Sequence, residues 1–262
     1  MLPNAIQEMD FSKSEQSILS IRISTDGFYF SIYNPLQANP FHFFKAELDK
    51  QLSLVANFKN LVAVAPFLSQ LYKKVNIVIA NTKSVLHPLH LFDESFAKEL
   101  FYFGQKLIST NNIVMHNKLI EHNQAVIFGI NDTLHTFLNQ HFGQPVIYSQ
   151  TTCLLRNFNK EAKENRNKSM FIYFENSNLQ VYAYNKEKLL LNNVFKTNEI
   201  NNQIYYILYC WKQLKFSQEN DSLYLYGEVK MKEEIVDTIR KYIISVSIDN
   251  NSEYIDLKNI NL

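Results

Sequence analysis

Alternating apolar and polar positions predict strands in two separate stretches of the chain. Near the N-terminus the alternation covers residues 19–24 and 28–33, and Thr25-Asp26-Gly27 between them supplies a hairpin turn. Apolar residues recur at helical spacing over residues 48–72. The run over residues 75–80 is almost wholly apolar, which is typical of a strand buried on both faces. The predicted order is strand-strand-strand-helix-strand, over residues 19–24, 28–33, 41–46, 48–72 and 75–80.

The same order recurs in the second half of the chain. Three strand-like runs are followed by a long helical run and a last strand, over residues 170–175, 179–184, 188–195, 199–216 and 223–227. A repeated βββαβ pattern is the signature of a duplicated α/β unit. We therefore predict an α/β protein built from two such units with mixed sheets, and a cleft between the two halves.

The length of the chain and one polar segment predict the domain boundaries. With 262 residues the chain can form two domains. We expect an N-terminal domain over residues 1–156, in which residues 81–150 are an insertion, and a C-terminal domain over residues 169–262. Residues 157–168 hold four Asn, four Lys or Arg and two Glu. This composition predicts an exposed linker.

Smaller patterns predict further elements. Residues 113–119 and 124–130 form a second hairpin in the prediction, and a helix covers residues 132–142. Residues 85–88 break the pattern at Pro88, and residues 254–257 are expected to form a weak edge strand. Trp211 falls on the apolar stripe of the long helix, so we expect it in the core.

Composition narrows the class of protein. Apolar residues make up 46% of the chain and charged residues 19%, which is typical of a packed globular protein. Because 26 Lys plus Arg balance 25 Asp plus Glu, no net field attracts nucleic acid or an anionic membrane. No apolar run is long enough to insert in a membrane. Cys153 and Cys210 lie in apolar surroundings and match no metal or redox spacing, so we expect core thiols and a cytoplasmic location.

The hairpin over residues 19–33, its echo over 170–195 and the segment 200–227 together resemble the actin-like ATPase superfamily. More narrowly, the chain resembles a bacterial family of uncharacterised proteins with a degenerate form of that fold, related to cytoplasmic components of pilus assembly and type II secretion. The resemblance covers nearly the whole chain. It implies two RNase H-like domains that face each other across the cleft.

The resemblance also indicates where a nucleotide site would lie. Active members of the superfamily use a Gly-rich turn in each half, because only Gly lets backbone N–H groups approach phosphate oxygens closely. Here the first turn offers Asp26 and Gly27, residues 175–178 contain no Gly, and a single Gly227 followed by Glu228 stands where paired glycines are normal. The candidate cleft residues are Asp26, Gly27, Glu175, Gly227 and Glu228.

Each candidate also has an ordinary structural interpretation. Asp26-Gly27 suits a plain hairpin turn. Glu175 and Glu228 are expected to end adjacent parallel strands, where two carboxylates could share a metal ion, but each also suits an exposed strand end. An RNase H-like nuclease would need a carboxylate inside its first strand, and this chain has Arg22 there in one copy and Ile172-Tyr173 in the other. The seven His form no ligand pair in sequence.

The sequence therefore predicts a non-catalytic actin-like scaffold or interaction protein without intact phosphate-binding loops. No catalytic residue, metal ligand or cofactor is assigned, and the expected partner is a protein, with a second copy of the chain as one option. The alternative is a divergent nucleotide-binding protein, a weak ATPase or kinase-like enzyme. It would hold ATP and Mg²⁺ in the interdomain cleft through Asp26, Glu175 and Glu228.

Overall fold

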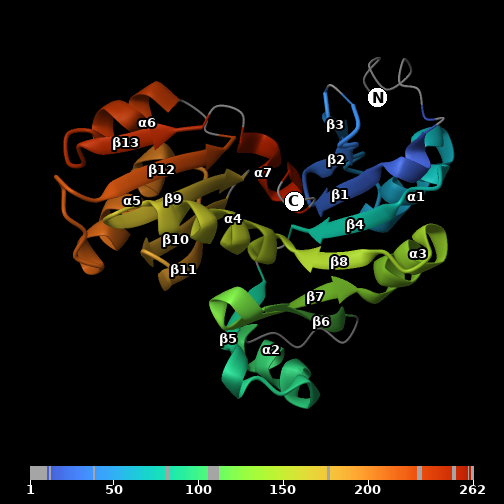
Figure 1. Cartoon of the computed structure of the whole chain (residues 1–262), viewed down its shortest axis with the longest axis horizontal. Coiled ribbons are helices and arrows are strands. Elements are labelled where there is room, and N and C mark those ends of the chain that lie inside the picture. The colour runs from blue at the N-terminus through green and yellow to red at the C-terminus, as the bar shows by residue number, and fades with distance from the viewer. Residues whose placement is uncertain are drawn as a thin grey trace. The chain divides into compact units, whose positions relative to one another are not determined.

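The computed structural model describes residues 11, 13–37, 39–80, 83–105, 112–175, 178–228, 232–249, 252–258 and 260. The chain forms two compact units (Figure 1). The first unit contains Met1–Cys153 together with Asp256–Leu262, and the second contains Leu154–Ile255. Each unit is built around one five-stranded sheet.

The sheet of the first unit has the strand order β3-β2-β1-β4-β8. Its strands are β1 (Ile18–Ser24), β2 (Gly27–Tyr33), β3 (Phe41–Glu47), β4 (Lys74–Ile79) and β8 (Val146–Ser149). Strands β1, β2 and β3 form an antiparallel meander, whereas β4 runs parallel to β1 and β8 runs parallel to β4. The predicted hairpin over residues 19–33 is confirmed, with Ser24 opposite Gly27 at the turn.

Two helices cover one face of this sheet. Phe58 of α1 (Leu54–Val64) and Leu138 of α3 (Asp132–Phe142) pack in one core with the β1 side chains Leu19, Ile21 and Ile23. The material predicted to be helical over residues 48–72 forms two helices, and the first of them, α1, begins later than expected. It begins after Ser53, whose hydroxyl accepts a hydrogen bond from Ala56 N, and Pro66 ends it by starting the 3₁₀ helix η3 (Pro66–Ser69).

A second, three-stranded sheet is inserted between β4 and α3. Its strand order is β5-β7-β6, formed by β5 (Ser84–Pro88), β6 (Asn112–Leu119) and β7 (Gln124–Asn131), and α2 (Ala97–Gln105) packs on it. The predicted hairpin of β6 and β7 is confirmed. The break predicted at residues 85–88 is wrong, because β5 pairs with β7 and Pro88 occupies the end of an edge strand, where a missing N–H is tolerated.

The expected insertion over residues 81–150 is also too long. Helix α3 and strand β8 return to the main sheet, since β8 pairs with β4 from Asn76↔Val146 to Ile79↔Ser149. The remaining short 3₁₀ helices of this unit are η2 (Ser14–Gln16), η4 (Leu89–Leu91), η5 (Glu94–Phe96) and η6 (Ile120–His122).

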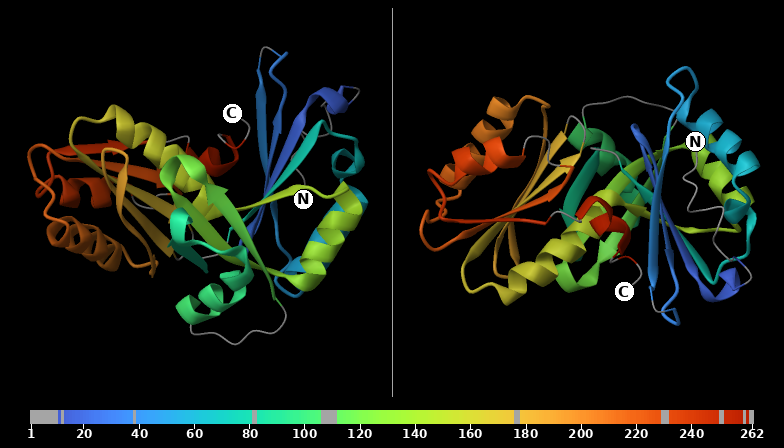
Figure 2. Two further views of the ribbon diagram at one scale, coloured as in Figure 1. Left: turned by 60° about the horizontal axis from the view of Figure 1, so that its bottom comes forward. Right: turned by 90° about the horizontal axis from the view of Figure 1, so that it is seen from above.

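The second unit repeats the topology of the first. Its sheet has the order β11-β10-β9-β12-β13, the same as β3-β2-β1-β4-β8. Its elements are β9 (Lys168–Glu175), β10 (Asn178–Asn185), β11 (Lys188–Lys196), α5 (Ile200–Gln213), β12 (Ser222–Gly227), α6 (Lys232–Ile239) and β13 (Ser245–Ile248). Trp211 of α5 is buried in a core with Ile207 and with Ile235 of α6, so the expected core position of Trp211 is confirmed. Figure 2 shows the helix-covered sheets from two further directions.

Two segments predicted as linker and strand are helical. Helix α4 (Gln150–Glu164) runs through most of the expected linker over residues 157–168. Phe158 and Ala162, four residues apart, are fully buried on one side of it, while Lys160, Lys163 and Glu164 are exposed. Residues 254–257 do not form an edge strand, because the chain there ends η7 (Ser252–Tyr254) and forms α7 (Ile255–Lys258), with Leu257 buried.

Candidate functional site

Arg22 lies inside β1, on the face of the sheet opposite α1 and α3. Successive side chains of a strand point to opposite faces, so Leu19, Ile21 and Ile23 enter the helix-covered core while Arg22 faces the other way. Arg22 pairs across the sheet with Tyr29 of β2 and Val78 of β4.

A buried ion pair occupies that face. Arg22 Nη1 donates to both carboxylate oxygens of Asp256, in α7, at 3.0 and 3.1 Å. Gln150 Nε2 donates to Asp256 Oδ2 at 2.9 Å, and the guanidinium lies 3.7 Å from the centre of the Tyr29 ring. Arg22 is 2% exposed and Asp256 is 0% exposed. Two buried charges of opposite sign compensate each other, so removing either one leaves an uncompensated charge in the protein interior.

The turn between β1 and β2 holds two of the predicted site residues. Ser24 Oγ donates to Asp26 Oδ1, and Tyr29 Oη donates to Asp26 Oδ2 at 2.7 Å. A Cβ atom at Gly27 would lie 2.9 Å from the carbonyl oxygen of Ala46 in β3. Gly27 therefore permits the close approach of β3, and the Asp26 carboxylate is bound by hydroxyls of its own hairpin.

The other three predicted site residues lie at one edge of the second unit. Strands β9 and β12 are parallel, Gly227 pairs with Phe174, and Glu228 N donates to Phe174 O at 3.1 Å. Glu175 and Glu228 thus lie at neighbouring strand ends, both half-buried, and Glu175 Oε2 accepts a hydrogen bond from Gln180 Nε2 at 3.3 Å. Asn176 and Ser177 of the second turn lie outside the described residues.

Gly227 has a backbone conformation that favours glycine. Its φ is +85°, and a Cβ atom there would lie only 2.2 Å from the carbonyl oxygen of Phe174. Its N–H donates to Ser252 Oγ at 2.8 Å. The glycine is therefore required by its positive φ and by the close packing of β12 against β9.

Backbone hydrogen bonds identify equivalent positions in the two units. Ala80 N donates to Ile23 O at 3.0 Å in the first unit, as Glu228 N does to Phe174 O in the second. Ala80 is therefore the counterpart of Glu228, and Arg22 is the counterpart of Tyr173. Tyr173 carries its own polar contact, because Tyr173 Oη donates to Glu253 O at 3.4 Å.

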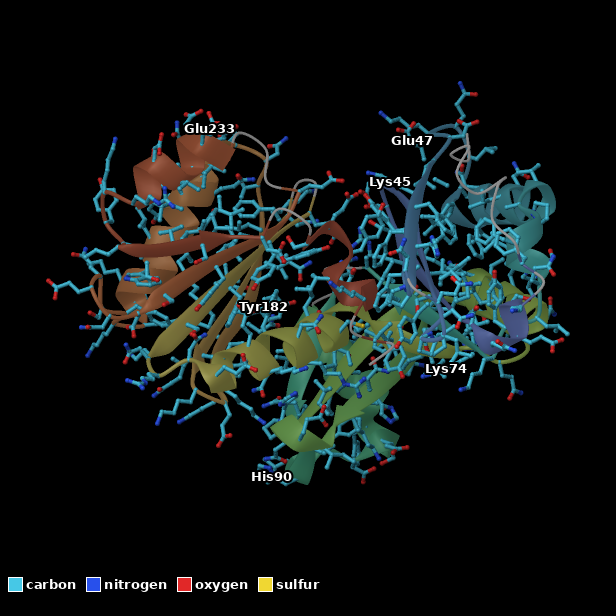
Figure 3. The ribbon with its side chains drawn as sticks, turned by 45° about the horizontal axis from the view of Figure 1, so that its top comes forward. Lys45, Glu47, Lys74, His90, Tyr182 and Glu233 are labelled. Atoms are coloured by element: carbon cyan, nitrogen blue, oxygen red, sulfur yellow. The ribbon has the colours of Figure 1, made fainter. Side chains whose placement is uncertain are left out.

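In the second unit, the sheet face that corresponds to the Arg22 face is aromatic around Tyr182. The ring of Phe158, in α4, lies 5.1 Å from that of Tyr182 and 4.9 Å from that of Phe171 (Figure 3 labels Tyr182). Tyr226 Oη donates to Glu161 of α4 at 2.5 Å. Burial, together with the nearby carboxylates of Asp249 and Glu164, raises the pKa of Glu161 despite this hydrogen bond.

Sequence reasoning missed Asp256 and Gln150. Arg22 occupies a polar position in an alternating strand, a pattern that by itself predicts a face exposed to solvent. The sequence offers 25 acidic residues, and the partner lies 234 positions away, in a segment predicted as strand. The alternation therefore revealed neither the burial of Arg22 nor the identity of its partner.

Other site classes find no support among the described residues. No group of three or more His, Cys, Asp or Glu side chains in the described ranges could hold a metal ion. Cys153 and Cys210 are buried, and burial raises the pKa of the Cys210 thiol to about 11. Of the helices described, none has the length and apolar character needed to cross a membrane.

Comparison with known proteins identifies the fold. A protein from Bacteroides thetaiotaomicron, described as having an actin-like ATPase fold and unknown function, shares 41% identity over 96% of this chain and 98% of its own, with a TM-score of 0.89. A structure described as the PilM-PilN type IV pilus biogenesis complex aligns with a TM-score of 0.56 at 11% identity, over 91% of this chain and 89% of its own. The expected actin-like ATPase fold is confirmed.

Comparison with curated proteins found no match. A family model described as "Protein of unknown function (DUF3822)" matches residues 6–246, which is most of the chain. Together with the 41% identity to the Bacteroides thetaiotaomicron protein, this match shows that the chain belongs to that family.

Proposed function

We propose that this protein is a non-catalytic member of the actin-like fold that acts by binding a protein partner. The observation that carries the proposal is the buried Arg22–Asp256 pair. It places a guanidinium, already bound by a carboxylate, inside the first strand of the sheet. A guanidinium has no lone pair to offer, so Arg22 cannot supply a ligand for the metal ion on which phosphoryl transfer depends.

The predicted phosphate-site residues support the same proposal. Asp26 accepts hydrogen bonds from Ser24 and Tyr29, so binding a hydrated metal ion would require giving up these partners. Gly27 and Gly227 are both explained by contacts with carbonyl oxygens of neighbouring strands. Each of these residues has a role in the fold that needs no phosphate group.

Two further observations favour protein contact as the activity. The pilus neighbour is described as a complex of PilM with PilN, so a protein of this fold is known in contact with another protein. In this chain Phe96 and Phe103 are 59% and 90% exposed, seven residues apart at the start and end of the α2 region. Exposed aromatic side chains are enriched where proteins meet.

The alternative, a divergent nucleotide-binding protein, has one observation in its favour. Glu175 and Glu228 lie at neighbouring ends of parallel strands, which is where ligands bind in α/β sheets. Binding of ATP and Mg²⁺ by these residues would be incompatible with the proposal, so the two functions can be separated by one measurement.

Thermal unfolding with ATP, ADP or GTP, with and without Mg²⁺, provides that measurement. A ligand that binds the folded state stabilises it by about 2.7 kcal/mol when present at a hundredfold excess over its dissociation constant. We expect no Mg²⁺-dependent rise for the natural chain. A rise that disappears in Glu228→Gln and persists in the surface control Glu219→Gln would overturn the proposal and establish the alternative.

A further inference from the structure

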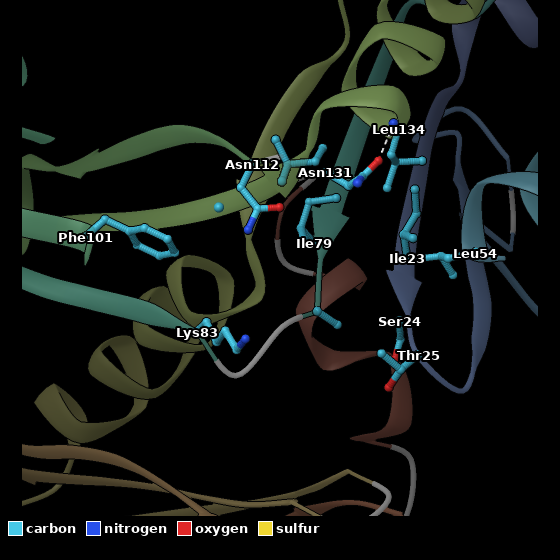
Figure 4. A pocket seen from close by; sticks show the side chains of 13 residues that line it. Ile23, Ser24, Thr25, Leu54, Ile79, Lys83, Phe101, Asn112, Asn131 and Leu134 are labelled. Atoms are coloured by element: carbon cyan, nitrogen blue, oxygen red, sulfur yellow. Dashed lines mark hydrogen bonds between the residues drawn. The ribbon is translucent and has the colours of Figure 1, made fainter. Parts of the chain in front are cut away.

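A pocket lies in the first unit where β1 and β4 end. Its volume is about 170 Å³, and it opens between the carboxyl edge of the main sheet and the inserted sheet (Figure 4). Ile23 and Ile79 from the main sheet, Ile130 of β7 and Phe101 of α2 form its apolar wall. The carboxyl ends of parallel strands are the usual ligand-binding edge of α/β sheets.

The size and lining of the pocket restrict its ligand. Most of the lining surface is apolar. A cavity of about 150 Å³ lined by aliphatic and aromatic side chains accommodates benzene. A pocket of this volume therefore fits one six-membered ring, or a branched aliphatic group of equal size. A nucleotide is far too large for it.

The side chains of Lys83 and Thr25 add a polar rim. Lys83 lines the pocket, is exposed, and forms no ion pair within the described ranges. In Figure 4 its side chain extends toward the side on which Ser24 and Thr25 end β1. Asp26, in the same turn, does not line the pocket and directs its carboxylate to Ser24 and Tyr29. The rim thus presents one ammonium group next to an apolar chamber.

Two small residues keep the chamber open. Ala80 lines it, although its counterpart in the second unit is Glu228, so the backbone at this position accepts a longer side chain. Gly129 also lines it, and a Cβ atom there would lie 3.0 Å from Phe101 Cζ. Glycine at this position lets the Phe101 ring reach the chamber wall.

We propose that this pocket binds a small monocarboxylate with an apolar body of about the size of a benzene ring. The carboxylate pairs with Lys83, and the apolar body packs on Ile79, Phe101 and Ile130. This inference does not depend on the non-catalytic function, because the pocket is lined by neither member of the Arg22–Asp256 ion pair and not by Gln150.

An NMR titration of the full chain tests the proposal with benzoate, and with benzamide as a neutral probe of the same shape. We expect benzoate to shift the amide resonances of Ala80 and Gly129 with saturation at a dissociation constant of about 1 mM or lower. Benzamide is expected to bind about tenfold more weakly, because it lacks the charge that Lys83 recognises.

Two variants locate the binding. Lys83→Met keeps the length of the side chain but removes its charge, so it should weaken benzoate binding about tenfold and leave benzamide unchanged. Ala80→Leu should abolish binding of both probes by filling the chamber. Because Lys83 is exposed, Lys83→Met decides the question even if Ala80→Leu does not fold.

Three outcomes would overturn the proposal. They are the absence of saturable shifts with benzoate up to about 10 mM, equal affinity of benzoate for Lys83→Met and the natural chain, and equal affinity of benzoate and benzamide. Equal affinity of the two probes would leave only a generic apolar cavity.

Discussion

The two units share one topology but differ on one face of the sheet. It is the face that α1 and α3 do not cover in the first unit, and that α5 and α6 do not cover in the second. In the first unit this face carries small polar groups and an ion pair, with Ser20, Arg22, Ser31 and Asn76 all buried. In the second unit the corresponding face is aromatic, with the buried residues Phe171, Tyr173, Tyr182, Tyr184 and Tyr226. The same strand order therefore carries a buried polar face in the first unit and a buried aromatic face in the second.

This difference changes what stabilises each unit. On the polar face, buried polar groups are compensated by specific partners, as in the Ser20–Asn76 hydrogen bond of 3.2 Å and the Arg22–Asp256 pair. The aromatic face depends on buried area and ring contacts, such as the stacking of Phe158 on Phe171. Apolar packing tolerates small changes of shape, whereas a buried charge does not tolerate the loss of its partner. Substitutions of similar size should therefore have unequal effects in the two units.

Asp256→Asn is expected to give the largest effect. It keeps the shape of the side chain but leaves the Arg22 guanidinium buried without a carboxylate, which should cost about 4 kcal/mol of the free energy of unfolding. Urea unfolding followed by circular dichroism measures this loss. The double variant Arg22→Met with Asp256→Leu should recover most of it, because no charge remains buried. A loss below about 1 kcal/mol in the single variant would show that the pair is not needed.

Gly227→Ala should be the next most damaging, at about 3 kcal/mol, because it combines a positive φ with a Cβ atom placed against the Phe174 carbonyl. Gly143→Ala is a matched control. Gly143 also has a positive φ, of +63°, but a Cβ atom there meets nothing within 4 Å. The control should lose about 1 kcal/mol in the same unfolding experiment. Equal losses of stability in the two variants would mean that the close approach of β12 to β9 adds nothing to the cost of Gly227→Ala.

Phe158→Leu tests the aromatic face with a conservative change. Leucine retains most of the buried area of Phe158 but loses the ring contacts with Phe171, Tyr182 and Tyr226. We expect a loss of about 1.5 kcal/mol, well below that of Asp256→Asn. Chemical denaturation of both variants under one set of conditions compares them directly. A larger loss for Phe158→Leu would reverse the contrast between the two faces.

Glu161→Gln should have the smallest effect, and its sign depends on pH. Because the pKa of Glu161 is raised in the folded state, the folded state favours the protonated carboxyl. The stabilising contribution of the protonated Glu161 carboxyl is present below the pKa of Glu161 in the unfolded state. It is lost as the pH rises through the pKa of Glu161 in the folded state. The variant keeps an acceptor for Tyr226 Oη without the charge. It should therefore be more stable than the natural chain at neutral pH, by about 0.5 kcal/mol, because the side chain is partly exposed to solvent.

Urea unfolding of the natural chain and Glu161→Gln between about pH 4 and pH 7 checks this dependence. The difference in stability should vanish at the acidic end, where both side chains are neutral. A difference that is independent of pH would mean that the change acts through packing and not through charge.

The sequence by itself determined the order of elements in both units, because that order is written in local periodicity. Alternation over residues 19–33 and 170–195 and the stripe that contains Trp211 record which side chains are buried, and burial repeats with the geometry of each element. The expected fold family came from the resemblance of residues 19–33, 170–195 and 200–227 to the actin-like ATPase superfamily. The candidate residues Asp26, Gly27, Glu175, Gly227 and Glu228 were also placed correctly at turns and strand ends.

Only the tertiary structure decided what each buried face packs against. Periodicity could not show that β8 joins β4, that α4 continues through residues 157–164, or that the C-terminal segment forms a helix. It also could not pair Arg22 with Asp256, because a buried charge requires a partner of opposite sign but does not say where in the chain that partner lies. Local pattern determines which face is buried, and long-range complementarity of shape and charge determines what covers it.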